Sequence, residues 1–213
     1  MTRGVGTVLG ATGAISVVTA INRLDVLPTR FLASSPASFE SGRVWLLCTS
    51  ALLADRPAAA SVAGFAVVGI AVCLMCGDRV AWLAAITGHL GSAVLVYSGI
   101  AIARLADPAA FHSVFTYSDY GTSAVIAAWI GAIGYRLWAG GARLSAAALC
   151  AVSGLVGWLF KNQLTVLDVE HVVALGFGVL AMRYAPRLPR RRVDRRRPRL
   201  RSAPAGISVS MTE

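Results

Sequence analysis

The sequence predicts an all-α, polytopic membrane protein of six transmembrane helices, and three observations point to that class. Hydrophobic residues make up 56% of the 213 residues and charged residues only 14%, so the chain is far more apolar than a soluble domain needs to be. The mean hydropathy is +0.67. Six apolar windows of 14 to 24 residues come close to the roughly 17 to 25 residues with which a helix crosses a bilayer.

The six predicted spans are separated by charged, proline-rich or glycine-rich segments. They cover residues 4–21, 58–76, 80–103, 119–137, 144–160 and 169–182. The first resembles a signal peptide, but no cleavage context follows it, so we expect it to be retained. The polar linker at 22–42 is the longest connection between spans, and long loops are often functional. Residues 43–53 are apolar but too short to span, which favours an interfacial segment with Trp45 at headgroup level.

Positive charge predicts both the domain boundary and the orientation. Ten of the twenty Lys and Arg lie between Arg183 and Arg201, so we expect a membrane domain at 1–184 and a basic, disordered cytoplasmic tail at 185–213. With six spans, fourteen positive residues lie on the side of the termini and six on the other. The positive-inside rule then predicts a multi-pass protein of the plasma (inner) membrane with both termini cytoplasmic. The tail could bind anionic lipid headgroups or only enforce topology, and no nucleic acid is expected as a partner.

The four cysteines and three histidines form no recognisable metal site. Cys73 and Cys76 have CxxC spacing, but no second pair or nearby His accompanies them, so packing is the simpler interpretation. Neither a metal nor a cofactor is expected.

Two polar residues at the heads of apolar spans form the candidate site. Ser123 follows Asp119 and Gly121, and His171 follows Asp168. Both spans run inward from the outer face, so the two side chains share a shallow depth that water can reach. Small residues at helical spacing after each would let the helices approach closely. A histidine within hydrogen-bond reach can activate a serine for acyl transfer. Asp119 and Asp168 are predicted helix caps.

Ordinary structural roles are open for the same residues. A serine in a membrane helix commonly bonds the preceding turn, and His171 suits an interfacial position beside two acids. His89, between Gly88 and Gly91, suits an inert contact between helices, and His112 suits a solvated loop.

The order of these features resembles the rhomboid family of intramembrane serine proteases. The closest resemblance is to a divergent bacterial, largely actinobacterial, rhomboid-like group with Gly-His-x-Gly, Asp-x-Gly-x-Ser and Asp-x-x-His motifs on the third, fourth and sixth helices. The segments at 88–91, 119–123 and 168–171 match them, and the resemblance covers about residues 1–182. It implies a six-helix rhomboid-like bundle in which Ser123 and His171 are the catalytic dyad and transmembrane segments of other proteins are the partners.

Three positions depart from the protease pattern. The predicted second span, 58–76, has neither the His nor the Asn that holds the oxyanion in well-studied rhomboids, Ala124 replaces a glycine, and Ala127 replaces an aromatic residue. Losing an oxyanion donor typically costs on the order of a hundredfold in rate. His89, with Gly121, is the remaining candidate for oxyanion support. Two functions therefore stay open, an intramembrane serine protease and a catalytically inactive rhomboid-like protein that binds client helices. A small transporter lacks support, because no charge lies mid-span and no inverted repeat is visible.

Overall fold

The computed structural model describes residues 3–161 and 166–185, and it is all-helical, with no strand in those two ranges. The six predicted spans correspond to long helices, which are α1 (Arg3–Arg23), α4 (Ala58–Cys76), the continuous α5 (Asp78–Ile86), η2 (Thr87–Gly91) and α6 (Ser92–Ala106), α8 (Thr122–Ala139), α9 (Arg143–Lys161) and α10 (Val166–Tyr184). Short helices occupy the connections, namely η1 (Thr29–Phe31), α2 (Pro36–Glu40), α3 (Leu46–Ser50) and α7 (His112–Thr116).

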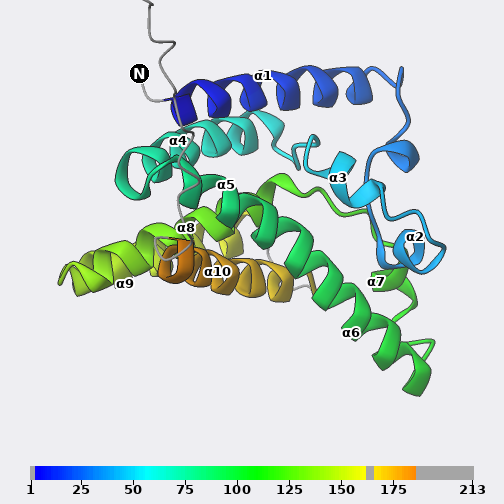
Figure 1. Cartoon of the computed structure of the whole chain (residues 1–213). Helices are drawn as coiled ribbons and strands as arrows, with labels where there is room; N and C mark the ends of the chain where they lie inside the picture. The colour runs from blue at the N-terminus through cyan, green and yellow to red at the C-terminus, as the bar shows by residue number, and fades with distance from the viewer. Residues whose placement is uncertain (1–2, 162–165, 186–213) are drawn as a thin grey trace, which may run out of the picture.

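The long helices alternate in direction, and α8 lies among them. It packs against α4, α5, α9 and α10, while α1 lies along α4 at the top of Figure 1. The short helices α2, α3 and α7 gather at the right of Figure 1, and α6 extends past the bundle on that side. Backbone hydrogen bonds tie the start of α8 to the 34–50 segment at this end. The linker and the interfacial segment predicted from the sequence thus cover the end of the bundle where α8 begins.

Three helical stretches are long and apolar enough to cross a membrane, among the residues that the structure describes. They are α1, α4 and the continuous helix from Asp78 to Ala106. Large hydrophobic side chains on their surfaces are exposed, including those of Val17, Val67, Leu74, Leu95 and Ile102. Exposed apolar surface on this scale is suited to lipid rather than water. The chain therefore has the character of a membrane protein with several candidate spans.

The core is built around a buried tryptophan of α8. Trp129 is completely buried, its Nε1–H donates to the Ala81 carbonyl oxygen at 2.7 Å, and its ring lies 4.7 Å from that of Phe65. Gly69 of α4 leaves room for the ring, since a Cβ there would stand 2.8 Å from it. This contact fixes the depth of α8 relative to α4 and α5.

One predicted helix boundary is wrong at the end of the bundle where α8 begins. Helix α8 begins at Thr122 rather than Asp119, because the backbone of Asp119 pairs with Ser34 instead of continuing the helix. Ala185, the first residue of the predicted tail, follows α10 and is buried against the core. The arginine-rich tail from 186 to 213 lies outside the described residues.

Candidate functional site

The crossing of α8 and α10 brings the two halves of the site together. A Cβ on Gly178 would overlap the backbone carbonyl of Ala128, and a Cβ on Gly131 would overlap that of Leu175. Ala174 is completely buried between the helices. The close approach expected from small residues is therefore present, and Ala128 lies at its tightest point.

Ser123 and His171 meet at this crossing. Ser123 Oγ lies 2.8 Å from His171 Nε2, and it can also donate to the Tyr120 carbonyl oxygen at 3.3 Å. Ser123 is the second residue of α8, and His171 lies in the second turn of α10. Both side chains are partly exposed. The pair has the distance and the solvent access that a serine nucleophile and its base require.

Asp168 lies on the far side of the histidine. Its Oδ1 is 3.9 Å from His171 Nδ1, and the side chains of Asp168 and His171 are 30% and 25% exposed. Asp168 was predicted to cap the helix, but α10 starts at Val166, so Asp168 lies inside the first turn. A carboxylate in that turn still favours the helix dipole. The Asp168 carboxylate, the His171 imidazole and the Ser123 hydroxyl thus lie in a row, with the imidazole in the middle.

Asp119 is not a helix cap. The residue before α8 is Gly121, which has no side-chain capping bond, and the carboxylate of Asp119 is buried away from the helix. Its Oδ2 accepts a hydrogen bond from the Tyr97 hydroxyl at 2.8 Å, and its N–H donates to the Ser34 carbonyl at 2.8 Å. Tyr97 also bonds the Ser34 hydroxyl at 3.0 Å. Asp119 therefore anchors the turn that leads into Ser123.

Two further bonds from the 34–53 segment hold the same turn. The Gly121 N–H donates to the Ser50 carbonyl at 3.0 Å, and the Thr122 hydroxyl donates to the Leu53 carbonyl at 3.0 Å. Both Gly121 and Thr122 are buried. The residues preceding Ser123 are thus fixed by a segment about seventy positions earlier in the chain.

His89 packs on this turn from the π-helical segment η2. Its Nε2 lies 2.6 Å from the Leu47 carbonyl oxygen and 3.3 Å from Ser50 Oγ. A carbonyl oxygen only accepts, so the Nε2–H donates to it and Nδ1 carries the lone pair. That buried Nδ1 has no partner within the described ranges. The ring lies where a side chain at Gly121 would otherwise be.

This arrangement bears on oxyanion stabilisation. The N–H of His89 is already used by Leu47, and no hydrogen bond links its ring to Ser123 in the described structure. Helix α4 contains neither His nor Asn. The N–H of Ser123 has no intrahelical acceptor, because it belongs to the first turn of α8. The start of α8 therefore presents backbone N–H donors beside the Ser123 hydroxyl.

Sequence reasoning missed several buried polar residues around this site. They are Ser34, Ser50, Ser92, Tyr97 and Glu170, each no more than 2% exposed. Glu170 accepts from the Ser92 hydroxyl at 3.3 Å. The sequence signal for these residues was a tyrosine and a glutamate within otherwise apolar spans. Polar groups are costly to bury in a membrane, so their presence there points to buried partners.

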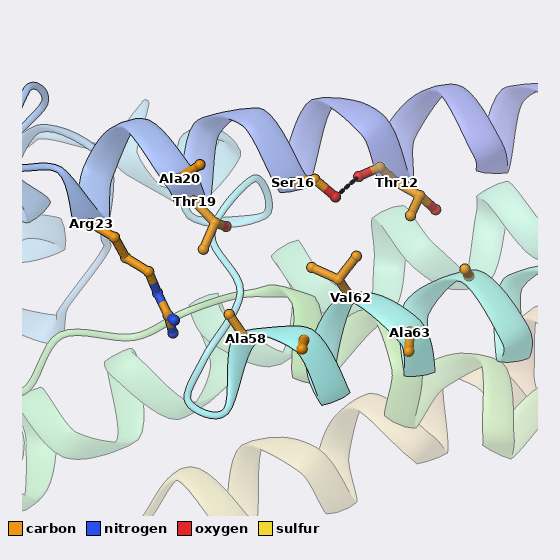
Figure 2. A pocket seen from close by; sticks show the side chains of 10 residues that line it. Thr12, Ser16, Thr19, Ala20, Arg23, Ala58, Val62 and Ala63 are labelled. Carbon is orange, nitrogen blue, oxygen red and sulfur yellow. Dashed lines mark hydrogen bonds between the residues drawn. The ribbon is translucent and has the colours of Figure 1, made fainter.

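Across 3–161 and 166–185, no cluster of His, Cys, Asp and Glu is arranged to hold a metal, and the four cysteines are free thiols. A groove of about 440 Å³ lies between α1 and α4. Figure 2 shows it lined by hydroxyl and alanine side chains, with Arg23 at one end. Neither Ser123 nor His171 lines it.

No protein-family model, no curated protein and no solved structure matches the chain.

Proposed function

We propose that this protein is a rhomboid-type intramembrane serine protease with a six-helix bundle, in which Ser123 and His171 form the catalytic dyad. The observation that supports this most strongly is the 2.8 Å distance between Ser123 Oγ and His171 Nε2 across two helices. A serine that only satisfied itself locally would bond the preceding turn. Ser123 can do that with Tyr120, yet it also has a histidine at shorter range.

The chemistry follows from the two groups. His171 Nε2 takes the hydroxyl proton as Ser123 Oγ attacks the carbonyl carbon of a peptide bond in a transmembrane substrate. The tetrahedral oxyanion is held by backbone N–H groups of the first turn of α8. His171 then gives its proton to the leaving amine, and an acyl-enzyme forms on Ser123. Water, activated by His171, hydrolyses the ester and restores the hydroxyl.

The proposal also includes the orientation of the protein in the membrane. The protein is a multi-pass protein of the inner membrane with cytoplasmic termini, so the dyad lies near the outer interface. Partial exposure of Ser123 and His171 is consistent with the water supply that hydrolysis needs. Transmembrane segments of other proteins are the substrates, and arginines after Met182 contact anionic lipids.

A second candidate function is an inactive rhomboid-like protein that binds client transmembrane helices. The composition of α4, without His or Asn, favours it. So does His89, because its N–H is occupied by the Leu47 carbonyl. In this function the Ser123–His171 bond stabilises the helix crossing and does no chemistry.

Labelling with a fluorophosphonate probe separates the two functions. Purified protein in detergent should react covalently, and the reaction should disappear in Ser123→Ala and in His171→Ala. Ser153→Ala is the matched control, because Ser153 bonds only the Leu149 carbonyl one turn earlier in α9. Absence of labelling in folded wild-type protein, or equal labelling in all variants, would contradict the protease proposal. Binding of a client helix without labelling would favour the second function.

A further inference from the structure

The hydroxyl proton of Ser123 has two possible acceptors. One is the Tyr120 carbonyl oxygen at 3.3 Å, and the other is His171 Nε2 at 2.8 Å. Which of the two accepts the hydrogen bond from the hydroxyl depends on the tautomer of the imidazole. A neutral ring with its proton on Nε2 would donate to Ser123 Oγ, and the Ser123 hydroxyl would then donate to the Tyr120 carbonyl oxygen. Only the Nδ1–H tautomer leaves Nε2 free to accept.

We infer that Asp168 is a positioning residue that holds His171 as the Nδ1–H tautomer, so that the site is a Ser–His–Asp triad. This inference rests on the proposed function. Asp168 Oδ1 lies 3.9 Å from Nδ1, on the side of the ring opposite to Ser123. The carboxylate can only accept, so it favours the tautomer that presents N–H to it.

The placement of Asp168 is set by helix geometry. Asp168 and His171 are three residues apart on α10, and residues at that spacing are neighbours on a helix surface. At 3.9 Å the contact is longer than a hydrogen bond, but catalytic contacts in unliganded sites are often long and shorten when substrate binds. The same carboxylate would then stabilise the imidazolium formed when His171 takes the serine proton.

The neighbouring acid does not share this role. Glu170 lies one residue before the histidine, but it is buried and accepts from the Ser92 hydroxyl of α6. The two carboxylates of this part of α10 therefore face different partners. Glu170→Gln replaces a carboxyl group by an amide at almost the same place in sequence, which makes it the matched control.

Nitrogen NMR of the imidazoles tests the inference without relying on activity. The chain has three histidines, so ¹⁵N-histidine labelling gives three rings, assigned with His112→Gln and His171→Gln. We expect His171 to be the Nδ1–H tautomer in the wild type and in Glu170→Gln. In Asp168→Asn a large share should change to Nε2–H, and Asp168→Glu should retain most of the wild-type tautomer. An Nε2–H tautomer in the wild type, or no change in Asp168→Asn, would overturn the inference.

Probe labelling supplies the second readout. Substituting Asn for the acid of a buried triad costs about 10⁴-fold in rate. Because Asp168 is partly exposed, we expect the labelling rate of Asp168→Asn to fall by about ten- to a hundredfold, with the concentration dependence of labelling unchanged. Glu170→Gln should stay within about twofold of wild type. Equal rates for Asp168→Asn and wild type would overturn the inference. A wild type that does not label would defeat the proposed function instead, while the NMR result would still decide the tautomer.

Discussion

The ring of His89 fills the space that a side chain at residue 121 would occupy. A Cβ built on Gly121 would overlap His89 Cε1 and lie 2.6 Å from each ring nitrogen. The ring cannot withdraw easily, because its Nε2 bonds the Leu47 carbonyl. Gly121 is therefore required by the histidine and not by its own backbone conformation.

Gly121→Ala should accordingly destabilise the protein by about 1–3 kcal/mol, as overpacking of a closed core does. Thermal unfolding in detergent measures this, and probe labelling should fall at the same time. Gly13→Ala is the control, because nothing lies within 4 Å of a Cβ there. The double variant His89→Ala/Gly121→Ala should label faster than Gly121→Ala alone. A double variant that is no better would mean that His89 does more than fill space.

The helix crossing makes a second prediction with a control on the same helix. In Gly178→Ala the new methyl group meets the Ala128 backbone carbonyl, so α8 and α10 must separate. Gly176→Ala puts the same methyl group into open space. We expect Gly178→Ala to lower probe labelling more than tenfold and Gly176→Ala to leave it unchanged. Similar effects from both would show that the crossing does not position the dyad.

Much of the helical framework could be predicted from the sequence, because apolar runs long enough to span a bilayer are a local signal. The second predicted span, 58–76, coincides with α4. The start of α8 could not be predicted, because it depends on the pairing of Asp119 with Ser34, which is remote in the chain. The polar residues of 22–42 were predicted to form a linker, because partners such as Tyr97 and Asp119 lie on remote segments of the chain.

At the candidate site, too, local features could be predicted from the sequence and contacts between remote residues could not. A shared depth for Ser123 and His171 was predicted from the direction of their spans, and the small residues that let α8 and α10 approach were visible in the sequence. The contact between Asp168 and His171 was not predicted, because a helix cap and a partner for His171 are both compatible with the same spacing. Only the side-chain positions distinguish the two. The partners of Tyr97 could not be predicted either, because the sequence shows only one hydroxyl in an apolar helix.

The contact between Tyr97 and Asp119 is the basis of a third prediction. Tyr97→Phe removes a hydroxyl that donates to Asp119 and also bonds Ser34. Leaving a buried carboxylate without its donor costs about 1–3 kcal/mol. The unfolding midpoint should fall, and hydrogen exchange at 119–123 should become faster. Tyr135→Phe is the control, since none of the hydrogen bonds of the described residues involves the Tyr135 hydroxyl. Unchanged exchange in Tyr97→Phe would show that the turn is held by its backbone bonds alone.

Cysteine accessibility tests the predicted orientation. Cys48 is an exposed free thiol on α3, at the end of the bundle where α8 begins, whereas Cys73 is buried in α4. With cytoplasmic termini, a membrane-impermeant maleimide should label Cys48 in spheroplasts, and the signal should be lost in Cys48→Ser. Labelling that appears only after lysis would mean that the dyad faces the cytoplasm.

The π-helical segment η2 has a consequence for angular register. His89 and Tyr97 are eight residues apart, which in a regular α-helix leaves them about 80° from a common face. A π turn accommodates one extra residue, so the pair behaves as if about seven residues apart, close to two full turns. From one side of the helix, His89 then bonds the Ser50 hydroxyl and Tyr97 bonds the Ser34 hydroxyl. Deleting the extra residue after His89, at 90 or 91, would leave His89 and Tyr97 seven residues apart in a regular α-helix, so Tyr97 should still face Asp119.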